Sequence, residues 1–151
     1  DSFEIARKMS LSYSFGIANL TSAHPNSVVL EVKGKSGRTL EVQACSLGGG
    51  RIMINRLDGL DVNCSCEIPT LIVHNLDQPG HVAEVTSMLA HKSVNIANMS
   101  LYRDKRGGSA VMVVEMDQPL PKESLEWLEH LEGIVKVTYI NVTEGEEDDV
   151  L

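Results

Sequence analysis

Residues 71–81 read Leu-Ile-Val-His-Asn-Leu-Asp-Gln-Pro-Gly-His, and this stretch decides how the chain around it is organised. Its apolar first half predicts a buried strand, while Pro-Gly followed by the amphipathic run 82–90 predicts a helix. Asn75 and Asp77 leave the strand at alternate positions, so we expect them to face the same side. Gly80 would allow a ligand to approach the free N–H groups at the helix N-terminus.

The next predicted strand begins at residues 94–96, Val-Asn-Ile, and its Asn95 adds a further amide to the same candidate site. A carboxylate would meet the backbone N–H groups of the helix start. An ammonium group would meet the carboxylate of Asp77 and the amide oxygens of Asn75 and Asn95. The arrangement therefore suits a small zwitterion such as an amino acid.

The second half of the chain alternates strands and helices in a regular order. Strands are predicted at 71–75, 94–102, 109–116 and 134–142, and helices at 79–91 and 122–131. A charged hairpin turn at 103–108 joins the second and third of these strands. The order β-α-β-β-α-β is that of the ferredoxin-like fold. We assign this domain to residues 69–143, followed by an acidic, solvated tail at 144–151.

The first half, residues 1–68, shows the two-residue period of strands after a loosely helical segment at 2–15. Strands are expected at 28–33, 39–45, 51–55 and 61–66, joined by short turns in an antiparallel meander. The N-terminal helix would cover one face of that meander. The fold class is therefore α+β, with a meander and helix followed by a ferredoxin-like domain.

Composition excludes several kinds of partner and sets expectations for the compartment. The formal net charge of −8 and the 4% aromatic content argue against nucleic acid and against an anionic membrane surface. No apolar run approaches the ~20 residues that span a bilayer, and the N-terminus lacks the pattern of a signal peptide. The three cysteines suit a reducing cytoplasm better than a disulfide framework, so we expect a cytoplasmic protein.

Two further patterns have alternative interpretations. Gly48, Gly49 and Gly50 before Arg51 could form an anion site of backbone N–H groups, or simply a bend between two strands. Cys64 and Cys66 share one face of a strand, but with Cys45 they do not make a four-ligand metal set. We therefore predict buried small residues and no metal there.

The stretch 71–80 followed by Val-Asn-Ile at 94–96 resembles the ACT domain, a regulatory amino-acid-binding domain. In that family the ligand lies between the loop after the first strand and a neighbouring copy. The resemblance, together with the sheet face and the edge strand that an isolated domain would leave exposed, implies a homodimer through the ACT domains. The ligand-binding residues so expected are Asn75, Asp77, Gly80, His81, Asn95 and Ile96.

The first half adds a second resemblance, carried by His-Pro-Asn-Ser at 24–27 and by Ser-Leu-Gly-Gly-Gly-Arg-Ile at 46–52. Together with the ACT-like half, these segments resemble the β subunit of bacterial iron–sulfur L-serine dehydratase over nearly the whole chain. The resemblance implies a partner α subunit that holds a [4Fe–4S] cluster and converts L-serine to pyruvate and ammonia. The family's Pro-Ser-Ser-Ser-His-Thr motif is absent here. We therefore expect a regulatory, serine-binding C-terminal part that needs no cofactor of its own and does not catalyse alone.

Two alternatives remain open. The combination of an intervening domain with an ACT domain also resembles the C-terminus of D-3-phosphoglycerate dehydrogenase. A different class, an autonomous hydrolase, would use Ser87 with His91 or His81 and Asp77, because residues 87 and 91 share a helix face. No strained nucleophile turn precedes Ser87, which disfavours the hydrolase.

Overall fold

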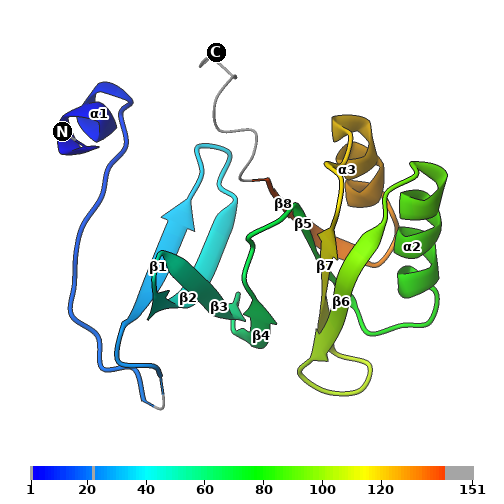
Figure 1. The fold of residues 1–151 in the computed structure, drawn as a ribbon, viewed down its shortest axis with the longest axis horizontal. Coiled ribbons are helices and arrows are strands. Elements are labelled where there is room, and N and C mark those ends of the chain that lie inside the picture. Colours follow the sequence, from blue (N-terminus) through cyan, green and yellow to red (C-terminus); the bar gives the residue numbers. More distant parts are fainter. Residues whose placement is uncertain (1, 22, 142–151) are drawn as a thin grey trace.

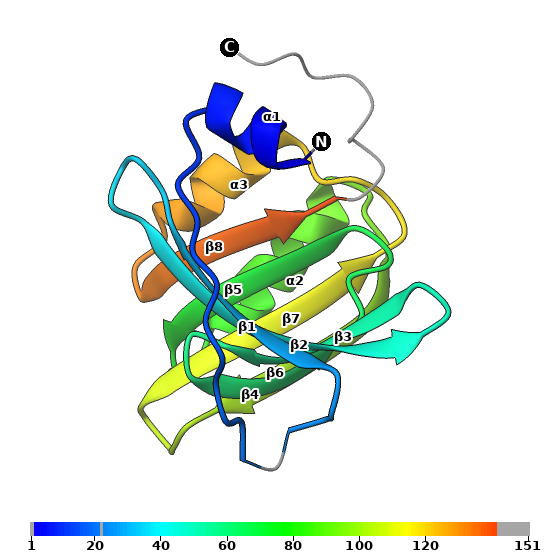
Figure 2. The same ribbon diagram turned by 90° about the vertical axis from the view of Figure 1, so that its left-hand side faces the viewer.

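The computed structural model describes residues 2–21 and 23–141, which form two antiparallel four-stranded sheets that pack against each other (Figures 1 and 2). In chain order the elements are α1 (Ser2–Lys8), β1 (Ser27–Lys33), β2 (Thr39–Gly48), β3 (Arg51–Leu57), β4 (Leu60–Cys64), β5 (Thr70–Leu76), α2 (His81–His91), β6 (Ile96–Arg103), β7 (Ser109–Met116), α3 (Lys122–Glu129) and β8 (Ile134–Ile140). The α+β class is confirmed. Within the described residues, none of the helices has the length and apolar character needed to cross a membrane.

The second sheet has the strand order β6-β7-β5-β8, which is the split βαββαβ arrangement expected from the sequence. Helices α2 and α3 cover one face of this sheet (Figure 1). Leu71 and Val73 of β5 project toward the helices and are fully buried with Val85, Leu89 and Leu128. The alternate residues of β5 face the other way, as the two-residue period of a strand requires.

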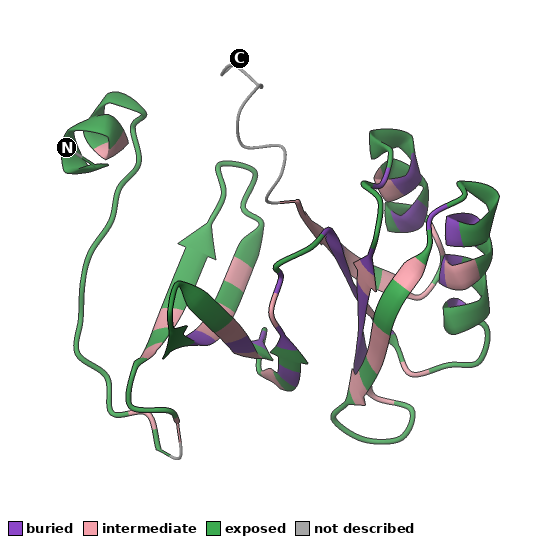
Figure 3. Ribbon diagram, in the orientation of Figure 1, coloured by how far each residue is buried: buried purple, intermediate pink, exposed green. Residues whose placement is uncertain are grey.

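The first sheet is a simple meander in the order β1-β2-β3-β4. Its inner face packs against the second sheet, where Ile54 and Leu57 meet Ile72, Val111 and Val113 in one buried cluster. Figure 3 shows buried residues on both sheets where they face each other. The second sheet therefore has no free face, in contrast to the expectation for an isolated domain of this kind.

The N-terminal helix does not cover the meander as expected. Helix α1 has no buried residue, and Figure 1 shows it well away from the first sheet. Phe3, Tyr13 and Phe15 instead form a small exposed aromatic group, with ring centroids 5.3 to 6.3 Å apart. The physical reason is that the two half-apolar sheets bury each other, so a seven-residue helix is not needed as a cover.

Candidate functional site

Two polar side chains are buried where β5 leads into α2. Asn75 is 6% exposed, and its Nδ2 donates to the carbonyl oxygen of Leu76 at 2.7 Å. His81 is 7% exposed, and its Nδ1 lies 3.2 Å from Oε2 of Glu84. Within the described part of the chain, Asn75 Oδ1 and His81 Nε2 have no hydrogen-bond partner. Buried polar atoms are normally paired, so these two unpaired acceptors mark a candidate ligand site.

The start of α2 offers donors that complement these acceptors. Gly80 is the N-cap residue with φ of 109°, a backbone conformation that favours glycine. No side chain among the described residues caps this helix, so the N–H groups of its first turn are available to an anion. The sequence prediction placed the start of the helix at residue 79, whereas the helix begins at His81.

Gly133, in the turn before β8, also lies beside His81. Its carbonyl accepts the Leu76 N–H at 2.9 Å, and a Cβ atom built on it would come within 2.5 Å of His81 Nε2. Its φ of +81° also favours glycine. A glycine immediately before the predicted strand 134–142 was the only sequence signal for this role.

Asp77 is bound to the β6–β7 hairpin. Its Oδ2 accepts hydrogen bonds from Arg103 Nη1 at 3.0 Å and from the Gly107 N–H at 2.9 Å. The Gly107 hydrogen bond, followed by that from Arg103, lowers the pKa of this carboxyl below its ordinary value. The carboxylate therefore fixes the β5–α2 loop to the hairpin, and its expected role as the partner of an ammonium stays a prediction.

Asn95 lies at the opposite end of the sheet, so the expectation that Asn75, Asp77 and Asn95 share one hollow within a chain is wrong. Strand β6 runs for eight residues from its start beside Asn95 to Arg103, a distance of about 25 Å at the usual rise per residue. Asn95 is exposed, and its Nδ2 donates to Asp117 at 2.6 Å. Ile96 packs against the helix-side core. The sequence spacing did not reveal that a whole strand separates the two ends.

The residues of the alternative hydrolase do not form a catalytic arrangement. His91 Nδ1 lies 2.7 Å from the backbone carbonyl oxygen of Ser87, so the contact does not involve the serine hydroxyl. Asp77 is engaged with Arg103. His24, in the turn before β1, accepts the Asn26 N–H at its Nδ1, which is ordinary turn chemistry.

The triple glycine forms the β2–β3 hairpin turn. Gly48 pairs with Arg51, and the two glycines between them have φ of 63° and 79°. Positive φ at both central residues is the mark of a type I′ turn, which accounts for Gly49 and Gly50 without a ligand. The anion site around Arg51 stays a prediction.

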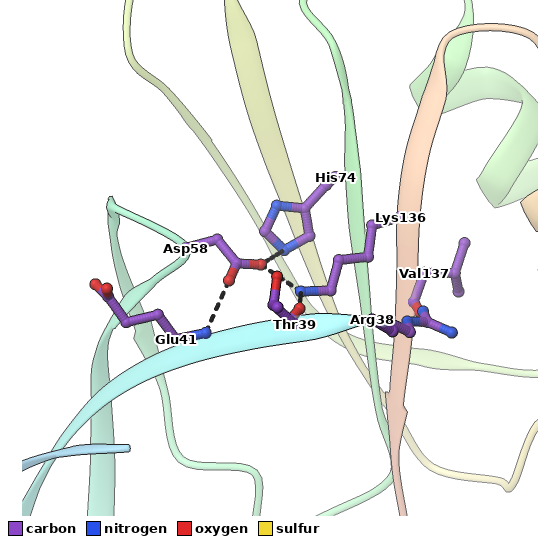
Figure 4. A network of polar contacts seen from close by, with 7 residues as sticks. All are labelled: Arg38, Thr39, Glu41, Asp58, His74, Lys136 and Val137. Carbon is purple, nitrogen blue, oxygen red and sulfur yellow. Dashed lines mark hydrogen bonds and ion pairs between the residues drawn. The ribbon is translucent and has the colours of Figure 1, made fainter. Parts of the chain in front are cut away.

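A polar cluster on the other face of β5 joins the two sheets, and we call Asp58, His74 and Lys136 the latch (Figure 4). His74 on β5 and Lys136 on β8 are directly opposed in the strand register. Both reach Asp58 Oδ2 in the β3–β4 turn, His74 Nε2 at 3.5 Å and Lys136 Nζ at 2.5 Å. Lys136 also donates to the Thr39 carbonyl at 2.7 Å. His74 thus faces the first sheet, whereas Asn75 faces the helices.

Burial and hydrogen bonds together determine the protonation states of Asp58 and His74. Burial alone would raise the pKa of Asp58, but hydrogen bonds from Lys136 and from the Glu41 N–H outweigh it and lower that pKa. Burial lowers the pKa of His74 in spite of the neighbouring Asp58 carboxylate. At neutral pH the latch therefore contains a charged Asp58–Lys136 pair and a neutral His74.

The second half of the chain is a ferredoxin-like domain with its candidate site at the N-terminus of α2. Residues 69–132 match the ACT domain family, so the second half of this chain is an ACT domain. The expected resemblance is confirmed on this point.

The chain as a whole is similar to L-serine dehydratase beta chains. It is 31% identical over 137 residues to the probable L-serine dehydratase beta chain of Bacillus subtilis, covering 91% of this chain and 62% of that protein. It is 28% identical over 142 residues to the L-serine dehydratase beta chain of Peptoniphilus asaccharolyticus, covering 93% and 64%. The chain thus spans less than two thirds of either relative. It is also 31% identical over 90 residues to the D-3-phosphoglycerate dehydrogenase of Methanocaldococcus jannaschii, covering 60% of this chain and 17% of that protein.

Proposed function

We propose that the ACT domain binds a small amino acid, with L-serine as the first candidate, at the N-terminus of α2. The observation that carries the proposal is the pair of buried acceptors, Asn75 Oδ1 and His81 Nε2, that lack a partner among the described residues. The contact with Glu84 favours the tautomer with the proton on Nδ1, which leaves Nε2 as an acceptor. An ammonium group supplies the donors that both atoms need, and the uncapped helix start receives the carboxylate.

Both acceptor atoms are shielded from solvent, so an amino acid reaches them only when a neighbouring segment moves. We propose that this segment is the β5–α2 loop, which carries Gly80 at the helix start. Asp77 fixes this loop to the hairpin through Arg103 and Gly107. Ligand binding is therefore coupled to the position of the hairpin at the end of β6.

A homodimer would explain how Asn95 contributes to the same site. Strand β6 is at the edge of its sheet. If it pairs with β6 of a second copy around a two-fold axis, the strands run antiparallel, and the start of one lies beside the end of the other. Asn95 of the second copy then comes close to Arg103 and Asp77 of the first. A single species of about 16.5 kDa in light scattering, with or without L-serine, would contradict the dimer.

We further propose that the chain is the regulatory part of the β chain of a cytoplasmic L-serine dehydratase, an ammonia-lyase that converts L-serine to pyruvate and ammonia. The similarity to two such beta chains over 91% and 93% of this chain supports this. Catalysis would belong to a partner α subunit that holds the [4Fe–4S] cluster. The cysteines here do not fit that cluster, because Cys64 and Cys66 contact each other and the described residues contain no group of three potential metal ligands.

The latch offers a route by which binding is reported to the first sheet. His74 directly follows Val73 and precedes Asn75 on β5, and the β5–β8 register is interrupted between His74 and Asn75. A shift of Asn75 on ligand binding would therefore move the neighbouring latch residue. Coupling of this kind is typically worth about 1–3 kcal/mol, enough for a several-fold change in the affinity or activity of a partner.

Titration calorimetry of the whole chain with L-serine tests the site. We expect heat of binding for the wild type and a loss of at least about tenfold in affinity for His81→Ala, which corresponds to about 1.4 kcal/mol. His91→Ala, at the exposed end of the same helix, is the matched control and should bind as the wild type does. L-lactate, which lacks the ammonium group, should not bind. Equal affinity of the two variants would remove the assignment of the site.

The regulatory region of D-3-phosphoglycerate dehydrogenase remains the second candidate. The enzyme from Bacillus subtilis is 24% identical to this chain over 139 residues, covering 91% of it. Both functions predict binding of a small amino acid, so the partner distinguishes them. Specific association with the α subunit of a serine dehydratase supports the first proposal, whereas its absence together with retained L-serine binding favours the second.

A further inference from the structure

The segment that connects the two sheets contains a pair of cysteines in direct contact. Cys64 ends β4 and Cys66 lies in the irregular segment before β5. Their sulfur atoms are 3.0 Å apart, and both thiols are free. Cys66 has φ of +53°, which turns the backbone so that its side chain returns toward that of Cys64. Neither residue has a role in the amino-acid site.

We propose that Cys64 and Cys66 form a peroxide-sensitive dithiol, which oxidises reversibly to an intramolecular disulfide. The proximity of the two sulfurs means that little rearrangement is needed to join them. The third cysteine, Cys45, is also buried but lies on β2 and is not paired with either of them in the described contacts. Of the three cysteines, we therefore expect only Cys64 and Cys66 to join in a disulfide.

The chemistry balances with a peroxide as the oxidant. The Cys64 sulfur attacks one oxygen of hydrogen peroxide, the O–O bond breaks, and a sulfenic acid and one water form. The Cys66 sulfur then attacks the Cys64 sulfur, and a second water leaves with the thiol proton. Two sulfur atoms together lose two electrons, and the peroxide is reduced to two waters. A dithiol reductant reverses the reaction by exchange.

The surroundings of the pair favour Cys64 as the first thiol to react. The hydrogen bond from Cys66 lowers the pKa of Cys64 against the opposing effect of burial, and the same contact raises the pKa of Cys66. Cys64 is 2% and Cys66 7% exposed, so only an oxidant as small as peroxide is expected to reach the pair in the folded chain. Larger oxidants would react more slowly because both residues lie in the core between the sheets.

Mass spectrometry of the tryptic peptides tests the proposal on the whole chain. Trypsin places Cys64 and Cys66 together in peptide 57–92 and Cys45 alone in peptide 39–51. After peroxide treatment of the folded chain and alkylation in denaturant, peptide 57–92 should lack two hydrogen atoms and carry no alkyl group. Peptide 39–51 should carry one alkyl group. Dithiothreitol before alkylation should restore two alkyl groups on 57–92.

Variants and an unfolded control separate this site from general oxidation. Cys66→Ser and Cys64→Ser should lose the disulfide, and Cys45→Ser should keep it. The disulfide should form about tenfold or more faster in the folded chain than in the urea-unfolded chain, because the fold holds the sulfurs together. Two alkyl groups on peptide 57–92 after peroxide, sulfinic acid in place of the disulfide, a cross-link to peptide 39–51, or equal rates in the two states would each overturn the proposal.

Discussion

Gly133 lies against His81 so closely that a Cβ atom at residue 133 would come within 2.5 Å of the histidine Nε2. Gly133 therefore leaves no room for a side chain next to His81 Nε2, one of the two unpaired acceptors of the proposed amino-acid site. The His81 ring cannot easily move away from residue 133, because it is buried and its Nδ1 contacts Glu84. The preference for glycine at this position thus has two separable causes, its φ of +81° and the contact with the ring.

Gly133→Ala should destabilise the chain by more than its backbone conformation alone requires. At Gly37, where φ is +86° and no atom of the described residues lies within 4 Å of the added Cβ, the same change costs only the conformational penalty of about 1–2 kcal/mol. At Gly133 the displaced histidine should add about 1–3 kcal/mol. Urea unfolding of both variants measures the difference.

The His81→Ala variant separates the two causes of the preference for glycine at residue 133. In a His81→Ala chain, Gly133→Ala should cost no more than Gly37→Ala, because the ring has been removed. An unchanged cost in that background would mean that the contact with His81 is not the reason for the glycine.

The sequence predicted the order of elements because each one carries its own local signal. The apolar run at 71–75 and the alternating residues of 28–33 show their period directly, and Pro79-Gly80 marks the helix start. No local sequence pattern indicates that the two sheets pack against each other. Strand β5 is apolar on both faces of the second sheet, with Leu71 on one face and Ile72 on the other, but this pattern does not identify what covers the second face. The N-terminal helix was therefore given a covering role that the second sheet fulfils.

The sequence predicted which residues of the candidate site lie together only where they are close in sequence. Asn75, Gly80 and His81 do lie around the start of α2, because one loop connects them. Asn95 lies at the far end of β6, and Gly133 lies in the turn before β8, which is distant in sequence. Their positions depend on how β6 and β8 add to the sheet, which is a long-range property that residue types alone do not determine.

Asp58→Asn should weaken the latch and the stability of the whole chain. The substitution leaves the Lys136 ammonium, whose side chain is 16% exposed, without its carboxylate partner. We expect a loss of about 2 kcal/mol, below the roughly 3–5 kcal/mol found when a fully buried ion pair is broken. Asp61→Asn is the matched control, because that side chain is 93% exposed and should change stability by less than about 0.5 kcal/mol. Equal unfolding midpoints for the two variants would contradict the latch.

The latch should also make the folded chain less stable as the pH falls below neutral. The pKa of His74 is lowered in the folded chain from an ordinary value of 6.5, so the unfolded chain binds the proton more readily. Stability from this group is complete above about pH 6.5 and decreases as the pH falls toward the lower folded pKa. The pKa of Asp58 is likewise lowered from 3.8, which adds a further loss as the pH falls below about 4.

His74→Gln should remove the loss of stability that begins below about pH 6.5. The loss below about pH 4, which comes from Asp58, should remain. Urea unfolding at several pH values between 7 and 3 measures the effect, and His91→Gln, at an exposed position, is the control that should keep the wild-type profile. A His74→Gln profile identical to that of the wild type between pH 7 and 5 would exclude the histidine as the origin.

Ile72→Ala tests whether the two sheets unfold as one unit. Ile72 is 1% exposed and packs in the cluster between the sheets, so its truncation should cost about 2–5 kcal/mol. Ile52→Ala, at a 48% exposed position of the first sheet, should cost about 1 kcal/mol or less. The single tryptophan, Trp127 on α3, reports only on the helix side of the ACT domain, whereas circular dichroism reports on both sheets. If the interface makes the chain cooperative, the two signals should change together in the wild type and in Ile72→Ala. Separate transitions in the wild type would show that the first sheet unfolds independently, and the latch could then carry no signal between them.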